Sequence, residues 1–304
     1  MASSSQIQQE VVGDGTSHQA PRDPLFPGLD VDSETTSSSN DSDSAIAVMS
    51  TSFPKSMAAL TIALKKEGLF RAPIKDLPGG LHNVLDFATG TGIWAIEFAN
   101  EHPSAIVVGT DLSPIQPDFV PANCLFVVDD AEDSWEFSQK FDYIHGRMLV
   151  TCFKSHLQVF KSAFSSLRPG GYIELQDLCI PTRCDDKTWD GTAYKHWMGL
   201  IMAGAEALGK DWSRVPKYKA FLQEAGFVDV VEEKYDIPIG TWAKGKINKT
   251  LGAWCKADTL GVLQGLSLAV LTKGLGMSVE EVEALLVDVR KNINNNHIHL
   301  YVTT

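Results

Sequence analysis

The pattern of apolar and polar positions changes its period repeatedly between residues 83 and 178. Five short apolar runs predict buried strands, at residues 83–87, 105–111, 124–130, 141–145 and 172–178. Two stretches with the longer spacing of amphipathic helices lie between them, at 92–103 and 155–167, and the sequence RPGG ends the second. Strands that alternate with helices indicate a parallel sheet with helices on both faces, which is the doubly wound α/β class.

The remaining segments are less regular. Residues 56–69 predict a helix that Ser56 caps, and residues 187–225 are expected to be mostly helical. The run 227–239 predicts one long strand, and residues 245–295 predict a helical insertion after it. The closing sequence HIHLYVTT predicts a last strand.

Composition separates the first 53 residues from the rest of the chain. They are rich in Ser, Asp, Thr, Gln and Gly, and they hold eight acidic residues but a single basic one, Arg22. Such a segment buries too little apolar surface to offset the entropy that is lost on ordering. We therefore expect a disordered acidic tail over 1–53 and one folded domain over 54–304. As an alternative, the hydroxyl-rich sequence SETTSSSNDSDS allows the tail to be phosphorylated or to dock a regulatory protein partner.

Charge and apolar content exclude several classes of partner. The net charge is −12 and no basic run is longer than Lys65-Lys66, so we expect no nucleic-acid partner. The N-terminus lacks the basic and apolar regions of a secretory signal, and the longest apolar stretch, 260–271, is too short to span a bilayer. We expect a cytoplasmic protein without a membrane partner. Apart from His297 and His299, no His or Cys spacing suggests a metal site, and we interpret that pair as structural.

The sequence DFATGTG, from Asp86 to Gly92, lies between the first predicted strand and the first predicted helix. Gly90 and Gly92 permit a tight turn and the close approach of a ligand to the backbone, with Ala88 and Thr89 in the same turn. The helix that follows presents free N–H groups and a partial positive charge, which favour an anionic group. A nucleotide phosphate and the carboxylate of a methionine moiety both meet this requirement. The glycine pattern also fits a dinucleotide site of the GxGxxA type.

Two carboxylates near this turn favour a methionine-containing cofactor over a dinucleotide. Asp86 lies four residues before Gly90, where it would repel a pyrophosphate but attract the ammonium group of a methionine. Its alternative role is to cap the turn. Asp111 ends the second strand, where it can accept hydrogen bonds from both ribose hydroxyls or, alternatively, cap the turn at Ser113.

The ends of the third and fourth strands add five candidate residues. Asp129, Asp130 and Ala131 follow the third strand, where a carboxylate can bind the adenine amino group and a backbone N–H can bind the ring. The alternative for a carboxylate of this segment is to cap the next helix. His145 and Arg147 end the fourth strand, and ligands of open α/β sheets bind at the carboxyl ends of strands. His145 has the near-neutral pKa of a general base, or it only shapes the pocket. Arg147 can bind a carboxylate of the acceptor or cofactor, or form a structural salt bridge.

Taken together, these segments resemble the fungal LaeA-type class I methyltransferases. The resemblance rests on VLDFATGTGIWAIEFA, GTDLSPIQPDFVPAN, VDDAEDSWEF, FDYIHGRML, LRPGGYIELQD and EAGFVDVVEEKYDIPIGTW, and it runs from about Asn83 to the C-terminus. It implies a Rossmann-like, seven-stranded sheet with its last strand antiparallel, and S-adenosyl-L-methionine as the cofactor. The residues that would bind this cofactor are Asp86, Ala88, Thr89, Gly90, Gly92, Asp111, Leu112, Asp129, Asp130, Ala131 and Arg147.

Three hypotheses for the function follow. The first is an S-adenosylmethionine-dependent methyltransferase that acts on a small-molecule acceptor in fungal secondary metabolite biosynthesis, with His145 as the catalytic base. The second is a LaeA-like regulator of secondary metabolism that acts mainly through protein partners and is located in the nucleus. The third is an NAD(P)-dependent oxidoreductase, which the sequence RPGG followed by YIE does not favour.

The chain departs from this family's pattern in three places. Ala88 stands where the family usually has Gly, which crowds the methionine end of the site. No Tyr-rich stretch like ENGRRYHAY, which helps to cover the cofactor in the family, precedes the helix expected at 56–69. The last strand of the expected sheet would be incomplete at Thr304.

Overall fold

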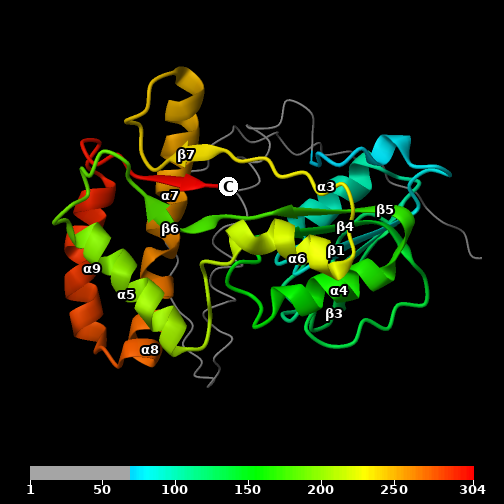
Figure 1. Cartoon of the computed structure of the whole chain (residues 1–304), viewed down its shortest axis with the longest axis horizontal. Coiled ribbons are helices and arrows are strands. Elements are labelled where there is room, and N and C mark those ends of the chain that lie inside the picture. The colour runs from blue at the N-terminus through cyan, green and yellow to red at the C-terminus, as the bar shows by residue number, and fades with distance from the viewer. Residues whose placement is uncertain (1–68) are drawn as a thin grey trace, which may run out of the picture. The chain divides into compact units, whose positions relative to one another are not determined.

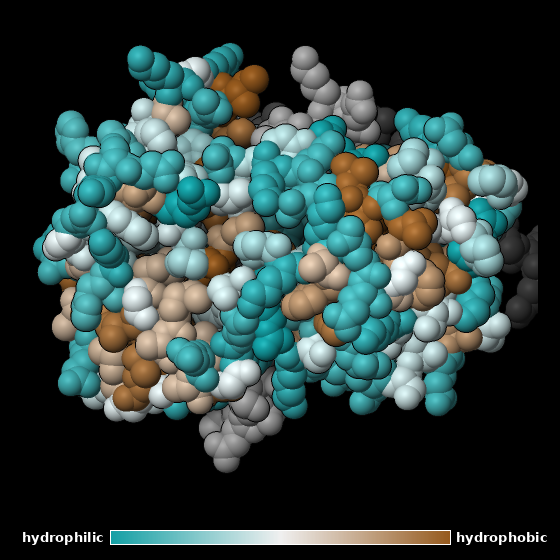
Figure 2. Space-filling model, in the orientation of Figure 1, coloured by the Kyte–Doolittle hydropathy of each residue, from teal (hydrophilic) through white to brown (hydrophobic). Residues whose placement is uncertain are grey.

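The computed structural model describes residues 69–304. The acidic tail expected at 1–53, and all but the last residue of the helix expected at 56–69, lie outside the described residues. Figure 1 shows a central sheet with helices on its two faces, and a second, smaller sheet with helices of its own. On the face drawn in Figure 2, hydrophilic residues predominate and hydrophobic residues form small separate patches.

The central sheet contains five parallel strands in the order β3-β2-β1-β4-β5. All five strands expected between residues 83 and 178 are present, with the bounds Asn83–Phe87 (β1), Ile106–Asp111 (β2), Cys124–Val128 (β3), Phe141–Arg147 (β4) and Leu167–Gln176 (β5). β5 begins earlier than expected, because Leu167 already pairs with Phe141 of β4. The sequence RPGG is therefore an irregularity inside the strand and not a turn before it.

The two faces of the central sheet have separate cores. Successive side chains of a strand point to opposite faces, so Val84 and Leu85 belong to different cores. Val84 packs in the cluster that contains Trp94 of α3, and Leu85 packs in the cluster that contains Phe160 of α4. Helix α3 thus covers one face, and helices α4 and α6 cover the other, with the bounds Ile93–Glu101, His156–Ser166 and Tyr218–Ala225.

The single seven-stranded sheet expected from the resemblance is not formed by residues 69–304. After β5 the chain enters a separate antiparallel sheet in the order β6-β8-β7, with the bounds Cys179–Arg183, Tyr301–Thr303 and Asp236–Pro238. Asp177 lies between β5 and β6 in the chain, and its carboxylate accepts hydrogen bonds from the backbone N–H groups of Leu149 and Leu178 at 2.9 and 2.8 Å.

The long strand expected at 227–239 is reduced to β7. This strand pairs with β8 alone, and the three residues of β8 limit its length. Val228 and Val231, in the segment before β7, are each 82% exposed. Phe227 and Val230 of the same segment are partly buried against the core that contains Phe160. The segment before β7 thus packs on that core without forming a strand, because no other strand of the described chain pairs with it.

The helices of the second part surround a core that contains Trp197, Leu263 and Leu286. They are α5, α7, the π-helix η3, α8 and α9, with the bounds Ala193–Ala207, Lys246–Ser267, Leu268–Thr272, Lys273–Leu275 and Val279–Ile293. Two short 3₁₀ helices complete the described elements, with the bounds Ile74–Asp76 (η1) and Val215–Lys217 (η2). Within residues 69–304, no helix combines the length and the apolar character that crossing a membrane requires.

Candidate functional site

The turn between β1 and α3 holds three residues in the left-handed backbone region. Ala88, Gly90 and Gly92 have φ angles of 51°, 59° and 75°, a conformation that glycine adopts readily. The Gly92 N–H closes the turn by donating to the Thr89 carbonyl at 3.0 Å. The structure therefore contains the tight turn that the sequence DFATGTG predicts.

Asp86, near the end of β1, places a buried carboxylate next to this turn. One carboxylate oxygen accepts a hydrogen bond from the Thr89 hydroxyl at 2.5 Å, and the other lies 2.7 Å from Nδ1 of His145. Asp86 and His145 are also register partners in the pairing of β1 with β4. Asp86 thus contacts two other residues that the sequence assigns to the site.

Asp111 ends β2 and binds the same turn from the neighbouring strand. One of its oxygens accepts a hydrogen bond from the Gly90 N–H at 2.8 Å, and the other accepts one from the Ser113 N–H at 3.0 Å. Each carboxylate oxygen has a second lone pair for a further donor. Leu112, beside it, is 52% exposed. A charged acceptor and an exposed apolar side chain therefore lie together at the glycine turn.

The segment after β3 is held close to Asp111. The Asp129 N–H donates to the Asp111 carbonyl at 3.0 Å, and burial raises the pKa of the Asp129 carboxyl. The Asp130 carboxylate accepts a hydrogen bond from the Glu132 N–H at 2.8 Å, and Ala131 is buried. The chain forms turns here, so Asp129 does not have the alternative role of helix cap.

Arg147 ends β4 on the side of the sheet that carries Asp86. Burial lowers the pKa of its guanidinium, while the charges of Asp86 and Glu97 oppose that shift. Arg147 forms no ion pair within 4 Å with another residue of the described part of the chain. The alternative role in a structural salt bridge is therefore not realised among these residues.

His145 is buried inside the protein, whereas a general base must reach the acceptor molecule. Its side chain is fully buried, and its ring stacks on the indole of Trp94 with the centroids 3.7 Å apart and 7° between the planes. Burial lowers the pKa of His145, although the hydrogen bond with Asp86 acts in the opposite direction. This position does not favour the role of general base that the sequence suggests.

Two further residues support the turn and were not identified from the sequence. Gln116 donates its side-chain N–H groups to the carbonyls of Gly90 and Ser113, at 2.6 and 3.0 Å. The ring of Phe126 on β3 occupies the space that a Cβ would need at Gly92, where the closest ring carbon would be 2.2 Å away. Gln116 lies in the motif DLSPIQP, which is a signal for it, whereas Phe126 has no local signal.

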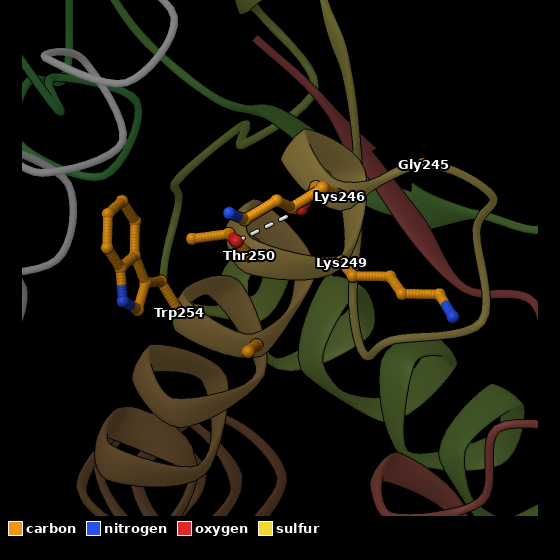
Figure 3. A pocket seen from close by; sticks show the side chains of 6 residues that line it. Gly245, Lys246, Lys249, Thr250 and Trp254 are labelled. Carbon is orange, nitrogen blue, oxygen red and sulfur yellow. Dashed lines mark hydrogen bonds between the residues drawn. The ribbon is translucent and has the colours of Figure 1, made fainter.

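The surface of the described residues is hollowed at the start of α7 and along β3. One hollow, of about 620 Å³, lies at the start of α7, and Figure 3 shows Lys246, Thr250 and Trp254 extending to one side of the helix and Lys249 to the other. The Thr250 hydroxyl donates to the Lys246 carbonyl at 3.0 Å. The other hollow, of about 740 Å³, lies along β3, and Asp129 is among its lining residues.

The two histidines of the sequence HIH do not converge on a common point. His297 is exposed, whereas His299 Nδ1 lies 2.5 Å from a carboxylate oxygen of Asp186. Within residues 69–304, no group of three or more His, Cys, Asp or Glu side chains is arranged to hold a metal ion.

Of the three left-handed positions of the turn, two are occupied by glycine and the third by Ala88. An L-residue in this conformation costs roughly 1–2 kcal/mol, and the extra entropy of glycine in the unfolded chain offsets about half of that. Ala88→Gly should therefore raise the free energy of unfolding by about 0.5–1 kcal/mol, measured by urea denaturation. A decrease of similar size would show that the Ala88 methyl group contributes more by packing than its backbone costs.

Asp177 makes the stability of the fold depend on pH. Burial raises the pKa of its carboxyl to about 7, although the Tyr218 hydroxyl donates to it at 2.9 Å. An unfolded Asp has a pKa of about 3.9, so between about pH 4 and pH 7 the folded chain binds more protons and its stability should fall as the pH rises. Asp177→Asn should remove up to about 1.4 kcal/mol per pH unit of this slope, measured by urea denaturation. Equal slopes in the two proteins would contradict the assignment.

Comparisons with known proteins identify the family of this chain. A family model described as a methyltransferase domain matches residues 50–232. The chain is 36% identical to methyltransferase pytC of Aspergillus terreus over 76% of its own length and 71% of that protein. It is 34% identical to the secondary metabolism regulator laeA of Monascus pilosus over 71% of its own length and 60% of that protein. A solved structure of phosphoethanolamine N-methyltransferase 2 from Haemonchus contortus aligns with a TM-score of 0.45 and 15% identity, covering 86% of this chain and 56% of that one.

The predicted family, the class I methyltransferase fold and the enzyme class are confirmed by these matches. Two parts of the fold prediction were wrong: the central sheet has five parallel strands and not seven with an antiparallel last one, and the strand expected at 227–239 is reduced to β7. The roles of the individual site residues stay predictions. From the glycine turn, the two carboxylates beside it and the matched residues, we conclude that this chain belongs to the methyltransferase-domain family.

Proposed function

We propose that this chain transfers the methyl group of S-adenosylmethionine to a small-molecule acceptor in fungal secondary metabolism. The observation that carries this proposal is the pair of carboxylates on the glycine turn. Asp86 and Asp111 come from neighbouring strands, and each is hydrogen-bonded to a residue of the turn, at 2.5 and 2.8 Å. Each carboxylate oxygen keeps a second lone pair, so one carboxylate can accept from an ammonium group and the other from the ribose hydroxyls of the same ligand.

The residues around this pair fit the rest of the cofactor. The exposed side chain of Leu112 offers an apolar surface for the adenine ring, and the half-buried Asp129 offers an acceptor for its amino group. The bound cofactor supplies an activated methyl group on its sulfonium. The task of the protein is then to hold the acceptor in line with that group, at about 3–3.5 Å. Arg147, at the end of β4, is placed to attract a carboxylate of the cofactor or acceptor.

Titration calorimetry with the full chain tests this proposal. We expect heat of binding for S-adenosylmethionine and S-adenosylhomocysteine, and no displacement of either by NADH. A chain that shows neither heat nor a thermal shift at millimolar S-adenosylmethionine would overturn the proposal. Incubation with methyl-labelled cofactor and an extract of a fungal host would then identify the labelled acceptor.

A second candidate function is regulation through protein partners, which the 34% identity to a regulator of secondary metabolism favours. In that case the acidic tail at 1–53 would dock the partner and the protein would enter the nucleus, whereas an enzyme of small-molecule metabolism is expected in the cytoplasm. Pull-down from a fungal extract with the full chain and with residues 1–53 deleted separates the two. Loss of a nuclear partner on deletion, without measurable methyl transfer, would favour regulation.

A further inference from the structure

The contact between His145 and Asp86 defines which ring nitrogen carries the proton. A carboxylate oxygen only accepts hydrogen bonds, so Nδ1 of His145 must donate across the 2.7 Å contact. The second carboxylate oxygen of Asp86 accepts the bond from Thr89 at 2.5 Å. The Asp86 carboxylate is therefore held at both oxygens, by β4 on one side and by the glycine turn on the other.

The His145 ring is itself held in one orientation. It lies parallel to the indole of Trp94, which follows the glycine turn in the first helical turn of α3. The Trp94 N–H donates to the Leu69 carbonyl at 3.1 Å, which fixes the indole in turn. Because the pairing of β1 with β4 also sets the spacing of Asp86 and His145, the donor atom has little freedom to move.

The burial of the pair strengthens the attraction of its carboxylate for a cationic group. Asp86 is 2% exposed and His145 is fully buried, and charges interact more strongly away from water. The direction in which His145 holds the Asp86 carboxylate therefore affects how strongly it attracts the ammonium group of a methionine moiety.

We propose that His145 is a positioning residue for the cofactor, which orients the Asp86 carboxylate toward the methionine end. This inference rests on the proposed function, because it assumes that the cofactor's ammonium group binds at Asp86. In this role His145 does not transfer a proton. It increases the affinity of the protein for the methionine end of the cofactor.

Two ligands that differ only at the methionine end provide the test. S-adenosylhomocysteine carries the amino acid group, and 5′-methylthioadenosine lacks it. His145→Phe keeps a ring for stacking on Trp94 but removes the donor, and it should weaken S-adenosylhomocysteine about tenfold while 5′-methylthioadenosine changes less than about twofold. His145→Asn keeps an N–H donor near the position of Nδ1, so its affinity for S-adenosylhomocysteine should stay close to that of the wild type.

His156→Phe is the matched control, because His156 is equally buried but bonds the Leu149 carbonyl and packs against the opposite face of the sheet.

The outcomes separate this inference from the proposed function. Equal weakening of both ligands by His145→Phe, or an unchanged affinity for S-adenosylhomocysteine, overturns the positioning role. If His145→Phe does not fold, the comparison of His145→Asn with His145→Leu gives the same test, since these two side chains have similar shape and differ in the donor. A wild-type chain that binds neither ligand overturns the proposed function itself and this inference with it.

Discussion

Replacing Asp111 by Ala should weaken the binding of S-adenosylhomocysteine by at least about tenfold. Hydrogen bonds to a charged acceptor contribute roughly 1.5–3 kcal/mol each, and about 1.4 kcal/mol corresponds to a factor of ten. The same carboxylate also accepts the N–H groups of Gly90 and Ser113, so its removal loosens the turn as well as the proposed ribose contact. Titration calorimetry on both proteins measures the change.

A second variant distinguishes the proposed contact of Asp111 with the ribose from its hydrogen bonds to the glycine turn. Gln116→Ala removes two hydrogen bonds to the carbonyls of Gly90 and Ser113 but no charge and no proposed ligand contact. It should weaken binding by less than about threefold. Asp118→Ala, an exposed carboxylate in the same loop, is the matched control and should leave the affinity unchanged. If Asp111→Ala has no larger effect than Gln116→Ala, Asp111 acts by shaping the turn and does not bind the ribose.

The parts of the fold that depend on local signals could be predicted from the sequence. Apolar runs of strand length and the spacing of Gly90 and Gly92 are properties of neighbouring residues, and the five parallel strands and the turn follow from them. The contact between Asp86 and His145 is a consequence of the same signals. Both residues lie near the carboxyl ends of strands, and β1 pairs with β4.

The parts that depend on distant contacts could not be predicted in this way. The apolar run at 227–239 has the composition of a strand, but a strand also needs a partner, and only β7 finds one in β8. Phe126 explains why Gly92 and Gly109 tolerate no side chain, yet only the pairing of β2 with β3 brings its ring there. His145 has the sequence position of a base, and its full burial becomes evident from the packing of Trp94.

Helix α7 approaches the backbone of Gly240 as closely as Phe126 approaches Gly92. This contact leads to the largest change that we expect in the free energy of unfolding. Gly252 lies buried in α7, and a Cβ at this position would be 1.9 Å from the carbonyl oxygen of Gly240 and 3.2 Å from Cγ of Pro238. The Gly240 N–H also donates to the Gly252 carbonyl at 2.9 Å. The helix and the segment after β7 are thus in direct backbone contact, which a side chain would force apart.

Gly252→Ala should lower the free energy of unfolding by about 1–5 kcal/mol, measured by urea denaturation. Helix propensity alone favours Ala over Gly by about 1 kcal/mol, so the expected sign is opposite to that of an ordinary helical site. The loss combines overpacking against backbone that cannot yield, at about 1–3 kcal/mol or more, with a buried hydrogen bond that is stretched or broken, at about 1–3 kcal/mol.

Gly261→Ala on the same helix is the matched control. Gly261 is exposed, and a Cβ there meets nothing within 4 Å, so propensity should dominate and the variant should gain about 0.5–1 kcal/mol. The two substitutions are chemically identical and lie in one helix, so a difference in sign isolates the backbone contact with Gly240. Stabilisation by both variants would mean that α7 and the segment after β7 are farther apart than the structure shows.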